Sequence, residues 1–206
     1  MARPEDHTIL TRDLRKVYLL SAGKHKVAVD KLNFTVDRGE VFGLLGVNGA
    51  GKTTTFKMLA GELTSTSGEA YFNGMKISDN LSAVRRQLGY CPQFDALLDN
   101  LTVREQLQLY YDMKSLPSEE MENLIETKIK EMNLEEYRDV LSGTLSGGNK
   151  RKLSVACAII GDPKIVFLDE PSTGMDPHAR RFMWRVISNI ATVLKQSTII
   201  LTTHSM

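Results

Sequence analysis

Short apolar runs and amphipathic stripes alternate along this chain. Three runs, at 41–45, 165–168 and 198–201, are continuously apolar rather than alternating. Such runs are typical of strands that are covered on both faces, as in parallel sheets. Glycine or polar residues follow each run, at the end of the strand where open α/β sheets place their ligands. The pattern therefore predicts three buried parallel strands with a ligand site at their carboxyl ends.

The segment 8–37 has a different pattern. Partial alternation over 8–18 and 26–36 flanks the turn sequence Ser-Ala-Gly-Lys. This arrangement predicts an antiparallel hairpin at the N-terminus.

Helical patterns fill the rest of the chain. A helix is expected after Lys52 and should end at Gly61. Thr102 begins a Thr-x-x-Glu capping box. Amphipathic stripes follow at 121–132, 153–160 and, after an Asp-Pro helix start, 183–194. Because residues from about 95 to 150 are mostly helical, we expect a helical subdomain inserted into an α/β core.

A glycine-rich loop follows the first apolar run. Residues 46–53 fit the pattern G-x-x-x-x-G-K-[ST] between a strand and a helix. Its glycines let backbone amides approach phosphate groups, and the helix N-terminus favours negative charge. Lys52 can reach the β- and γ-phosphates, and the Thr53 hydroxyl can coordinate Mg²⁺. The loop predicts binding of a nucleoside triphosphate.

Two carboxylates end the second apolar run. Asp169 can hold Mg²⁺ directly or through water. Glu170 should point elsewhere, because neighbouring side chains on an extended segment diverge, and it suits a general base for water attacking the γ-phosphate. The alternative is a carboxylate pair that caps the following turn.

A Leu-Ser-Gly-Gly-Asn segment at 145–149 precedes one amphipathic stripe. Ser146 suits a helix N-cap, and the amides of Gly147 and Gly148 suit an anion. A second anion site makes sense if it contacts a nucleotide held by another copy; a simple capped helix is the alternative. The basic run 150–152 is either a solvated face or a contact with an anionic partner.

Three further side chains are candidates for contacts with a nucleotide or its metal ion, because of their positions in the chain. His204 follows the third apolar run and can hydrogen-bond a γ-phosphate; a surface histidine is the alternative. Gln93 can complete Mg²⁺ coordination or place the water, or it is a polar loop residue. Tyr18 can stack on adenine, or it is a half-buried sheet tyrosine.

Composition narrows the function. The chain has 206 residues and a net charge of +1, so no global field attracts nucleic acid. Cys91 and Cys157 lie far apart, without metal-site spacing, which disfavours zinc and indicates a reducing compartment. No apolar run approaches the roughly 18 residues of a membrane span, and the N-terminus has no apolar signal core. We therefore expect that the chain itself does not cross a membrane.

Together and in this order, the motifs resemble the nucleotide-binding domain of ATP-binding cassette (ABC) transporters over nearly the whole chain. The resemblance implies a P-loop NTPase cassette of α/β class, with a mostly parallel core sheet, an N-terminal antiparallel β subdomain and the inserted helical subdomain. It implies ATP as substrate and Mg²⁺ as cofactor. The matching segments are the Walker A motif 46–54, the Q-loop Gln93, the signature 145–149, the Walker B motif 165–169, the catalytic Glu170, the D-loop 172–176, the switch His204 and the A-loop Tyr18.

By this resemblance, each group of site residues receives an expected role. The nucleotide is expected at Tyr18, Gly46, Asn48, Gly49, Ala50, Gly51, Lys52, Thr53 and Thr54. The metal is expected at Thr53, Gln93 and Asp169, and catalysis at Glu170, His204 and Gln93. A partner's ATP is expected at Ser146, Gly147, Gly148 and Asn149.

The amino-acid sequence at 46–59, 89–97 and 146–153 is similar to that of the second cassette of the A subfamily. Members of this subfamily are mostly eukaryotic lipid exporters or importers. Asn149 departs from the glutamine common across the superfamily, although A-type cassettes often carry asparagine there. Family domains continue beyond the switch histidine, so we expect residues 1–206 to be a C-terminally truncated cassette. The implied partners are a second cassette, head to tail, and transmembrane domains of the same transporter, at the cytoplasmic face of a membrane.

The sequence is compatible with two other functions. One is a soluble ABC-type ATPase of repair or translation, and the other is a nucleotide-binding regulatory domain with little hydrolysis. A small-molecule kinase is disfavoured, because the signature and the histidine would then have no purpose.

Overall fold

A computed structural model describes residues 2–190 and 197–203, and its centre is a four-stranded parallel sheet. The strands lie in the order β3-β8-β7-β6. Their bounds are β3 (Val41–Leu45), β6 (Leu88–Cys91), β7 (Ile165–Asp169) and β8 (Thr198–Thr203). The three apolar runs are all parallel strands of this sheet, as predicted. The hydrophobic pattern did not predict β6, which is short and contains Gly89 and Tyr90.

One of the three strands is less buried than its sequence predicts. Every residue of β7 and β8 is buried, whereas Val41 and Leu45 of β3 are 37% and 48% exposed. Among the described residues, β3 lies at the edge of the parallel sheet and pairs only with β8. The expectation of a fully covered strand is therefore wrong for β3.

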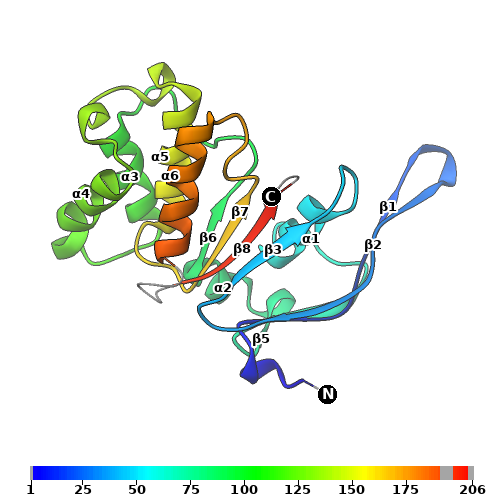
Figure 1. Ribbon diagram of the computed structural model, residues 1–206. Helices are drawn as coiled ribbons and strands as arrows, with labels where there is room; N and C mark the ends of the chain where they lie inside the picture. Colours follow the sequence, from blue (N-terminus) through cyan, green and yellow to red (C-terminus); the bar gives the residue numbers. More distant parts are fainter. Residues whose placement is uncertain (1, 191–196, 204–206) are drawn as a thin grey trace.

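A second sheet is antiparallel and includes the predicted hairpin. Its strands are β1 (Ile9–Leu19), β2 (His25–Val36), β4 (Ser67–Phe72) and β5 (Met75–Lys76), in the order β2-β1-β4-β5. The pairing of β1 with β2 confirms the hairpin, while β4 and β5 were not predicted. In Figure 1 this sheet and the helices α3 and α4 lie on opposite sides of the parallel sheet.

Helices connect and cover the strands. The α-helices are α1 (Lys52–Leu59), α2 (Leu81–Gln87), α3 (Val103–Met113), α4 (Met121–Glu131), α5 (Gly147–Ile159) and α6 (Pro177–Ser188). Short 3₁₀ helices span Pro4–Asp6, Ser21–Gly23, Ile77–Asp79, Ser118–Glu120, Glu135–Tyr137 and Ser142–Thr144. The region 95–150 contains α3, α4 and the start of α5.

Helix ends follow the predicted capping chemistry. Thr102 forms a capping box with Glu105 at the start of α3. Asp176 caps α6, and the amides of Ala179 and His178 hold the pKa of its carboxyl below its ordinary value. The helical stripe predicted to reach residue 194 gives an α-helix that ends at Ser188; residues 191–196 lie outside the described part.

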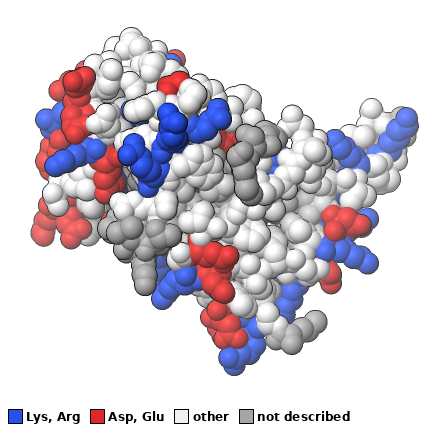
Figure 2. Space-filling view, viewed as in Figure 1, with Lys and Arg blue, Asp and Glu red and all other residues white. Residues whose placement is uncertain are grey.

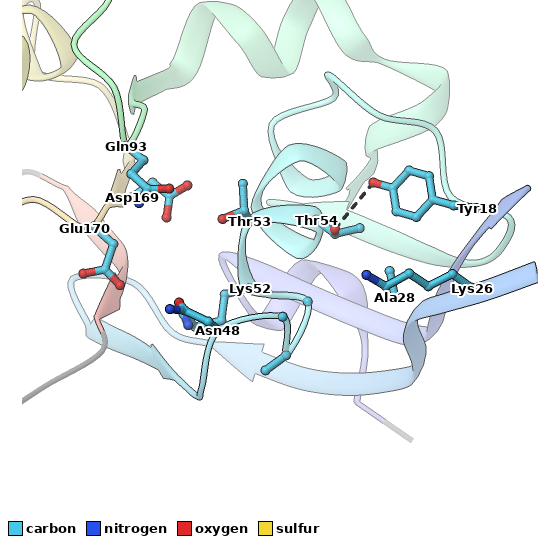
Figure 3. Close-up of a pocket in the computed structure, with 13 residues that line it drawn as sticks. Tyr18, Lys26, Ala28, Asn48, Lys52, Thr53, Thr54, Gln93, Asp169 and Glu170 are labelled. Atoms are coloured by element: carbon cyan, nitrogen blue, oxygen red, sulfur yellow. Dashed lines mark hydrogen bonds between the residues drawn. The ribbon is translucent and has the colours of Figure 1, made fainter. Parts of the chain in front are cut away.

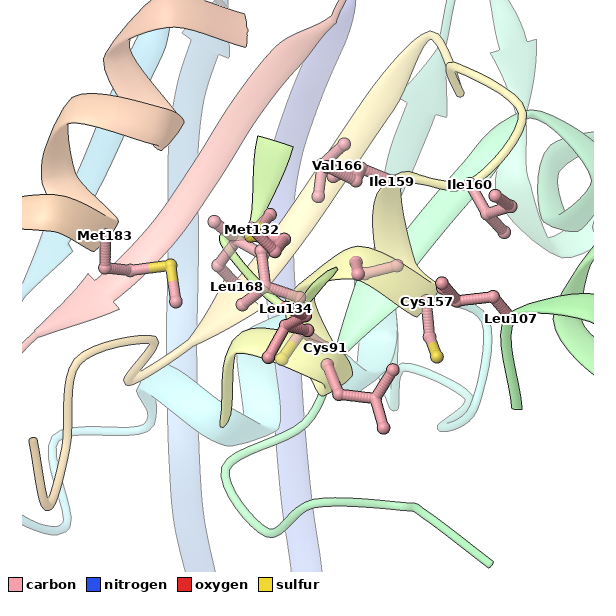
Figure 4. Close-up of a cluster of buried hydrophobic side chains, with 14 of the residues drawn as sticks. Cys91, Leu107, Met132, Leu134, Cys157, Ile159, Ile160, Val166, Leu168 and Met183 are labelled. Atoms are coloured by element: carbon pink, nitrogen blue, oxygen red, sulfur yellow. The ribbon is translucent and has the colours of Figure 1, made fainter. Parts of the chain in front are cut away.

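The parallel sheet separates two hydrophobic cores. Along β7, Ile165 and Phe167 face the core shared with α1 and the antiparallel sheet, while Val166 and Leu168 face the core shared with the helices. Figure 4 shows the second core, in which β-strand side chains meet those of α3, α5 and α6. Its two cysteines are free thiols, and burial raises the pKa of each. Both faces of β7 are therefore packed up to its carboxyl end.

Charge is mixed on the surface. On the face in Figure 2, basic and acidic side chains are interspersed, and neither sign covers it. This distribution agrees with the net charge of +1.

A pair of strand glycines allows a test of the packing between β6 and α5. A Cβ on Gly89 would lie 2.0 Å from the Ala158 carbonyl oxygen, whereas a Cβ on Gly43 of β3 would meet nothing nearer than 4.0 Å. We predict that Gly89→Ala lowers the free energy of unfolding by about 1–3 kcal/mol, because backbone must move. Gly43→Ala should stay within about 0.5 kcal/mol of the wild type. Chemical denaturation measures both, and equal stability of the two variants would contradict this packing.

Candidate functional site

A single pocket gathers most of the predicted site residues. It opens beside the carboxyl ends of β3, β6 and β7, as expected for an open α/β sheet. In Figure 3 the loop residues Thr53 and Lys52 lie between two groups of side chains, one at each end of the pocket. The pocket is lined by Tyr18, Lys26, Ala28, Asn48, Gly49, Ala50, Gly51, Lys52, Thr53, Thr54, Gln93, Asp169 and Glu170.

The loop 46–53 wraps over the start of α1. Gly51 has φ +91°, and a Cβ there would lie 2.3 Å from the Ala28 carbonyl oxygen of β2. Glycine is therefore required both by the backbone angle and by close contact between loop and hairpin. Lys52 is only 8% exposed, and its ammonium donates to the carbonyls of Gly46 and Val47 at 2.5 and 3.3 Å. The loop thus holds a buried cation directly beside the pocket.

The carboxylate of Asp169 is oriented by a neighbouring strand. Its Oδ1 accepts a 2.5 Å hydrogen bond from the Thr202 hydroxyl of β8, and the residue is 2% exposed. Its Oδ2 is buried and has no hydrogen-bond partner among the described residues. Thr53 and Gln93 line the same pocket. Hydroxyl, amide and carboxylate oxygens are the donors that Mg²⁺ prefers, so these residues fit that ion.

No cluster of three His, Cys, Asp or Glu side chains arranged as a metal site occurs within 2–190 and 197–203. A metal at this pocket would therefore depend on mixed oxygen donors, with Asp169 as the buried carboxylate.

Glu170 reaches the pocket through a sharp turn rather than an extended segment. Strand β7 ends at Asp169, and Glu170 has a left-handed φ of +53°. The expectation of a continuing extended chain is wrong here, because the backbone bends and leaves the extended conformation at Glu170, directly after the strand. The amide of Glu170 donates to the Thr202 hydroxyl at 3.0 Å, and its carboxylate accepts from the Thr173 hydroxyl at 3.3 Å. Thr202 therefore contacts both acidic residues, and it was not among the site residues predicted from the sequence.

The hairpin forms the opposite end of the pocket. Tyr18 lies half-buried there, and its hydroxyl is 3.5 Å from that of Thr54. Lys26 and Ala28 of β2 also line this end, and neither was predicted (Figure 3). A signal was available for Lys26, because it pairs with Tyr18 in the predicted hairpin.

The segment 145–149 lies apart from this pocket. Ser146 caps α5 by accepting from the Asn149 amide at 3.3 Å. Ser146 and Gly147 are exposed, and a Cβ on Gly147 or Gly148 would meet nothing within 4 Å. None of the four signature residues lines the pocket. The structure thus separates the two candidate anion sites of the chain.

The basic run 150–152 is not a uniform solvated face. Arg151 is 3% exposed and donates to the carbonyl of Pro92, just after β6, and to that of Asp169, the last residue of β7. Lys150 lies 3.9 Å from Asp99, and Lys152 lies 5.1 Å from the centre of the Phe182 ring. The solvated-face interpretation is wrong for Arg151, because α5 is buried on nearly all sides and this guanidinium contacts the chain just after β6 and at the end of β7. His204 lies outside the described residues.

Comparison with known proteins identifies the family. The model of the ABC transporter family matches residues 29–173, so the chain belongs to the ABC transporter family. It is 53% identical over 194 residues to the human "Retinal-specific phospholipid-transporting ATPase ABCA4" and 47% identical over 202 residues to the human "ATP-binding cassette sub-family A member 2". These matches cover 94% and 98% of this chain and 8% of each relative.

A solved structure agrees with the fold. The "ATP binding subunit of ABC transporter" is 31% identical, with a TM-score of 0.83, over 96% of this chain and 79% of that one. The α/β cassette fold expected from the sequence is confirmed, and the sequence is that of an A-subfamily cassette. The chain spans about a tenth of the length of the curated relatives that it matches. Within its described residues, no helix has the length and hydrophobicity to span a membrane.

Two threonines of β8 test the role of Thr202. Thr202→Val removes the hydroxyl that contacts Asp169 and Glu170, whereas Thr198→Val removes a buried hydroxyl that accepts from Gly39. Both variants should lose about 1–3 kcal/mol of the free energy of unfolding. Only Thr202→Val should also weaken Mg²⁺-dependent nucleotide binding, measured by fluorescent-nucleotide titration. Equal nucleotide affinities in the two variants would exclude a special role for Thr202.

Proposed function

We propose that this pocket binds ATP with Mg²⁺ and hydrolyses it. The observation that carries the proposal is the convergence of the loop 46–54 with Gln93, Asp169 and Glu170 around one pocket. Backbone amides of the loop and the N-terminus of α1 would cradle the phosphates. Lys52 would neutralise charge on the β- and γ-phosphates, and Tyr18 would stack against adenine at the hairpin end.

The metal-binding residues in this proposal are Thr53, Gln93 and Asp169. Bound Mg²⁺ neutralises charge that develops on the phosphate oxygens. Asp169 is suited to this role by its buried Oδ2, while Thr202 fixes the direction of the carboxylate.

Glu170 is the proposed general base. Its carboxylate lies at the pocket end with Asp169 and Gln93 (Figure 3). It would accept the proton of a water molecule that attacks the γ-phosphorus. The bond from this phosphorus to the bridging oxygen would then break, and ADP would be the leaving group. His204 is proposed to hydrogen-bond the γ-phosphate and Gln93 to help place the water.

Replacement of Glu170 by Gln tests this assignment. Because the amide cannot accept the proton, the hydrolysis rate should fall by at least about 100-fold. ATP affinity should remain within about twofold of the wild-type value, because the phosphate loop is intact. Steady-state phosphate release and nucleotide titration measure the two quantities. Glu119→Gln, at an exposed carboxylate outside the pocket, is the control; full turnover in Glu170→Gln would refute the base assignment.

We infer that the signature segment serves a second cassette. Ser146 and Gly147 are exposed at the N-terminus of α5 and lie outside this chain's pocket. A helix N-terminus with bare glycine amides suits a phosphate. Ser146, Gly147, Gly148 and Asn149 would therefore contact ATP held by a partner cassette, in a head-to-tail pair that ATP holds together.

Light scattering tests whether two cassettes form this pair. We predict that Glu170→Gln shifts from monomer to dimer only when MgATP is present. The double variant Glu170→Gln, Gly147→Glu should stay monomeric with MgATP. The position has room for a side chain, and a carboxylate in the first turn of α5 favours the helix. The same carboxylate would repel the phosphates of the partner's ATP. Ser82→Glu, in the exposed first turn of α2, adds the same charge elsewhere and should leave the dimer intact. A monomer without and with MgATP would argue against a pair of identical chains.

Membership of the ABC transporter family supports a role in transport. The human relative ABCA4 is named a phospholipid-transporting ATPase. We propose that closure and opening of the cassette pair drive transmembrane domains of the same transporter, with a phospholipid as cargo. The helical region at about 95–150 would be a subdomain of this cassette, and the cassette would lie at the cytoplasmic face of the membrane.

A further inference from the structure

We propose that Arg151 is a positioning residue that holds the Glu170 turn and the Gln93 loop in the geometry for hydrolysis. The inference rests on the proposed function and assigns a role to a residue outside the nucleotide pocket. It starts from the burial of Arg151 on the first turns of α5, where 3% of the residue is exposed.

On one side, the guanidinium holds the turn after β7. Nη2 donates to the carbonyls of Asp169 and Glu170 at 2.5 and 3.0 Å. Nε donates to the carbonyl of Pro171 at 3.3 Å. Three consecutive carbonyls around the proposed base therefore point at one side chain.

On the other side, the same group holds the loop after β6. Nη1 donates to the carbonyl of Pro92 at 2.6 Å and to that of Gln93 at 3.4 Å. It also contacts the Asp95 carboxylate at 3.0 Å. One planar group thus ties together two loops that are about 75 residues apart in sequence and that both line the pocket.

The turn at Glu170 needs such support. A glutamate with φ +53° lies in the left-handed region, which side chains with a Cβ avoid, and it persists only where the surroundings fix it. Thr202 holds the amide of this residue, and Arg151 holds its carbonyl. With both ends of the residue fixed, the direction of the Glu170 side chain into the pocket is determined.

Lysine at position 151 could not make the same set of hydrogen bonds. An ammonium is a compact point charge, whereas the guanidinium presents five donors in a rigid plane that can reach two loops at once. Arg151→Lys therefore keeps the charge of α5 but loses the planar set of donors that contacts both loops. Arg151 is not among the residues that line the pocket, so direct nucleotide contacts should survive the substitution.

Kinetics provide the first test. With Arg151→Lys, kcat for ATP should fall by about 10- to 100-fold, the usual effect of losing a group that orients catalytic ligands. KM and the Kd for ATP should stay within about twofold. Lys130→Gln, at an exposed position of α4 outside the pocket, removes a charge and should keep the wild-type kcat. A wild-type kcat in Arg151→Lys, or a parallel loss of ATP affinity, would overturn the proposal.

Hydrogen–deuterium exchange of the chain without nucleotide provides a second test that does not depend on activity. Arg151→Lys should accelerate exchange in peptides covering 92–95 and 169–173, and leave those covering 46–54 and the rest of α5 unchanged. Faster exchange throughout α5 would mean general destabilisation and would overturn the positioning role. Absence of turnover in the wild type would count against the proposed function instead, while the exchange experiment would still decide the role of Arg151. Arg151→Gln repeats both measurements without the charge.

Discussion

The buried guanidinium of Arg151 is the interaction on which the site geometry depends. A charged group without water must be fully hydrogen-bonded, since its desolvation costs several kcal/mol. Here the acceptors are mainly backbone carbonyls from the loops after β6 and β7. Satisfying the charge therefore requires both loops to be in place. The hydrogen bonds that the Arg151 guanidinium needs therefore fix the positions of two loops, which carry Gln93 and Glu170.

The parallel sheet makes this convergence possible. Strands β3, β6 and β7 run in the same direction, so their carboxyl ends meet at one edge. Both faces of β7 are covered by separate hydrophobic cores. A strand clamped in this way can present Asp169 and then support a strained residue directly behind it, because the cost of the left-handed turn, about 1–3 kcal/mol, is offset by packing and hydrogen bonds.

The two candidate anion sites of the chain lie in different places. The loop 46–54 closes over a pocket that the hairpin completes, whereas Ser146 and Gly147 face outward. Yet α5, which begins at that exposed N-terminus, is joined through Arg151 to the carbonyls of Asp169 and Glu170. The helix that begins beside Ser146 therefore also carries the side chain that contacts the segment with the two carboxylates.

The sequence by itself determined what depends on local spacing. The buried strands β7 and β8, the helix caps, the phosphate loop 46–53 and the acidic pair at the end of β7 were visible, because each reflects hydrophobic period or neighbouring residue types. Only the tertiary structure decided which distant residues meet. Thr202 contacts Asp169 because β8 lies beside β7, and Arg151 is buried because α5 packs against that strand. Such contacts depend on strand order and helix orientation, which no local pattern encodes.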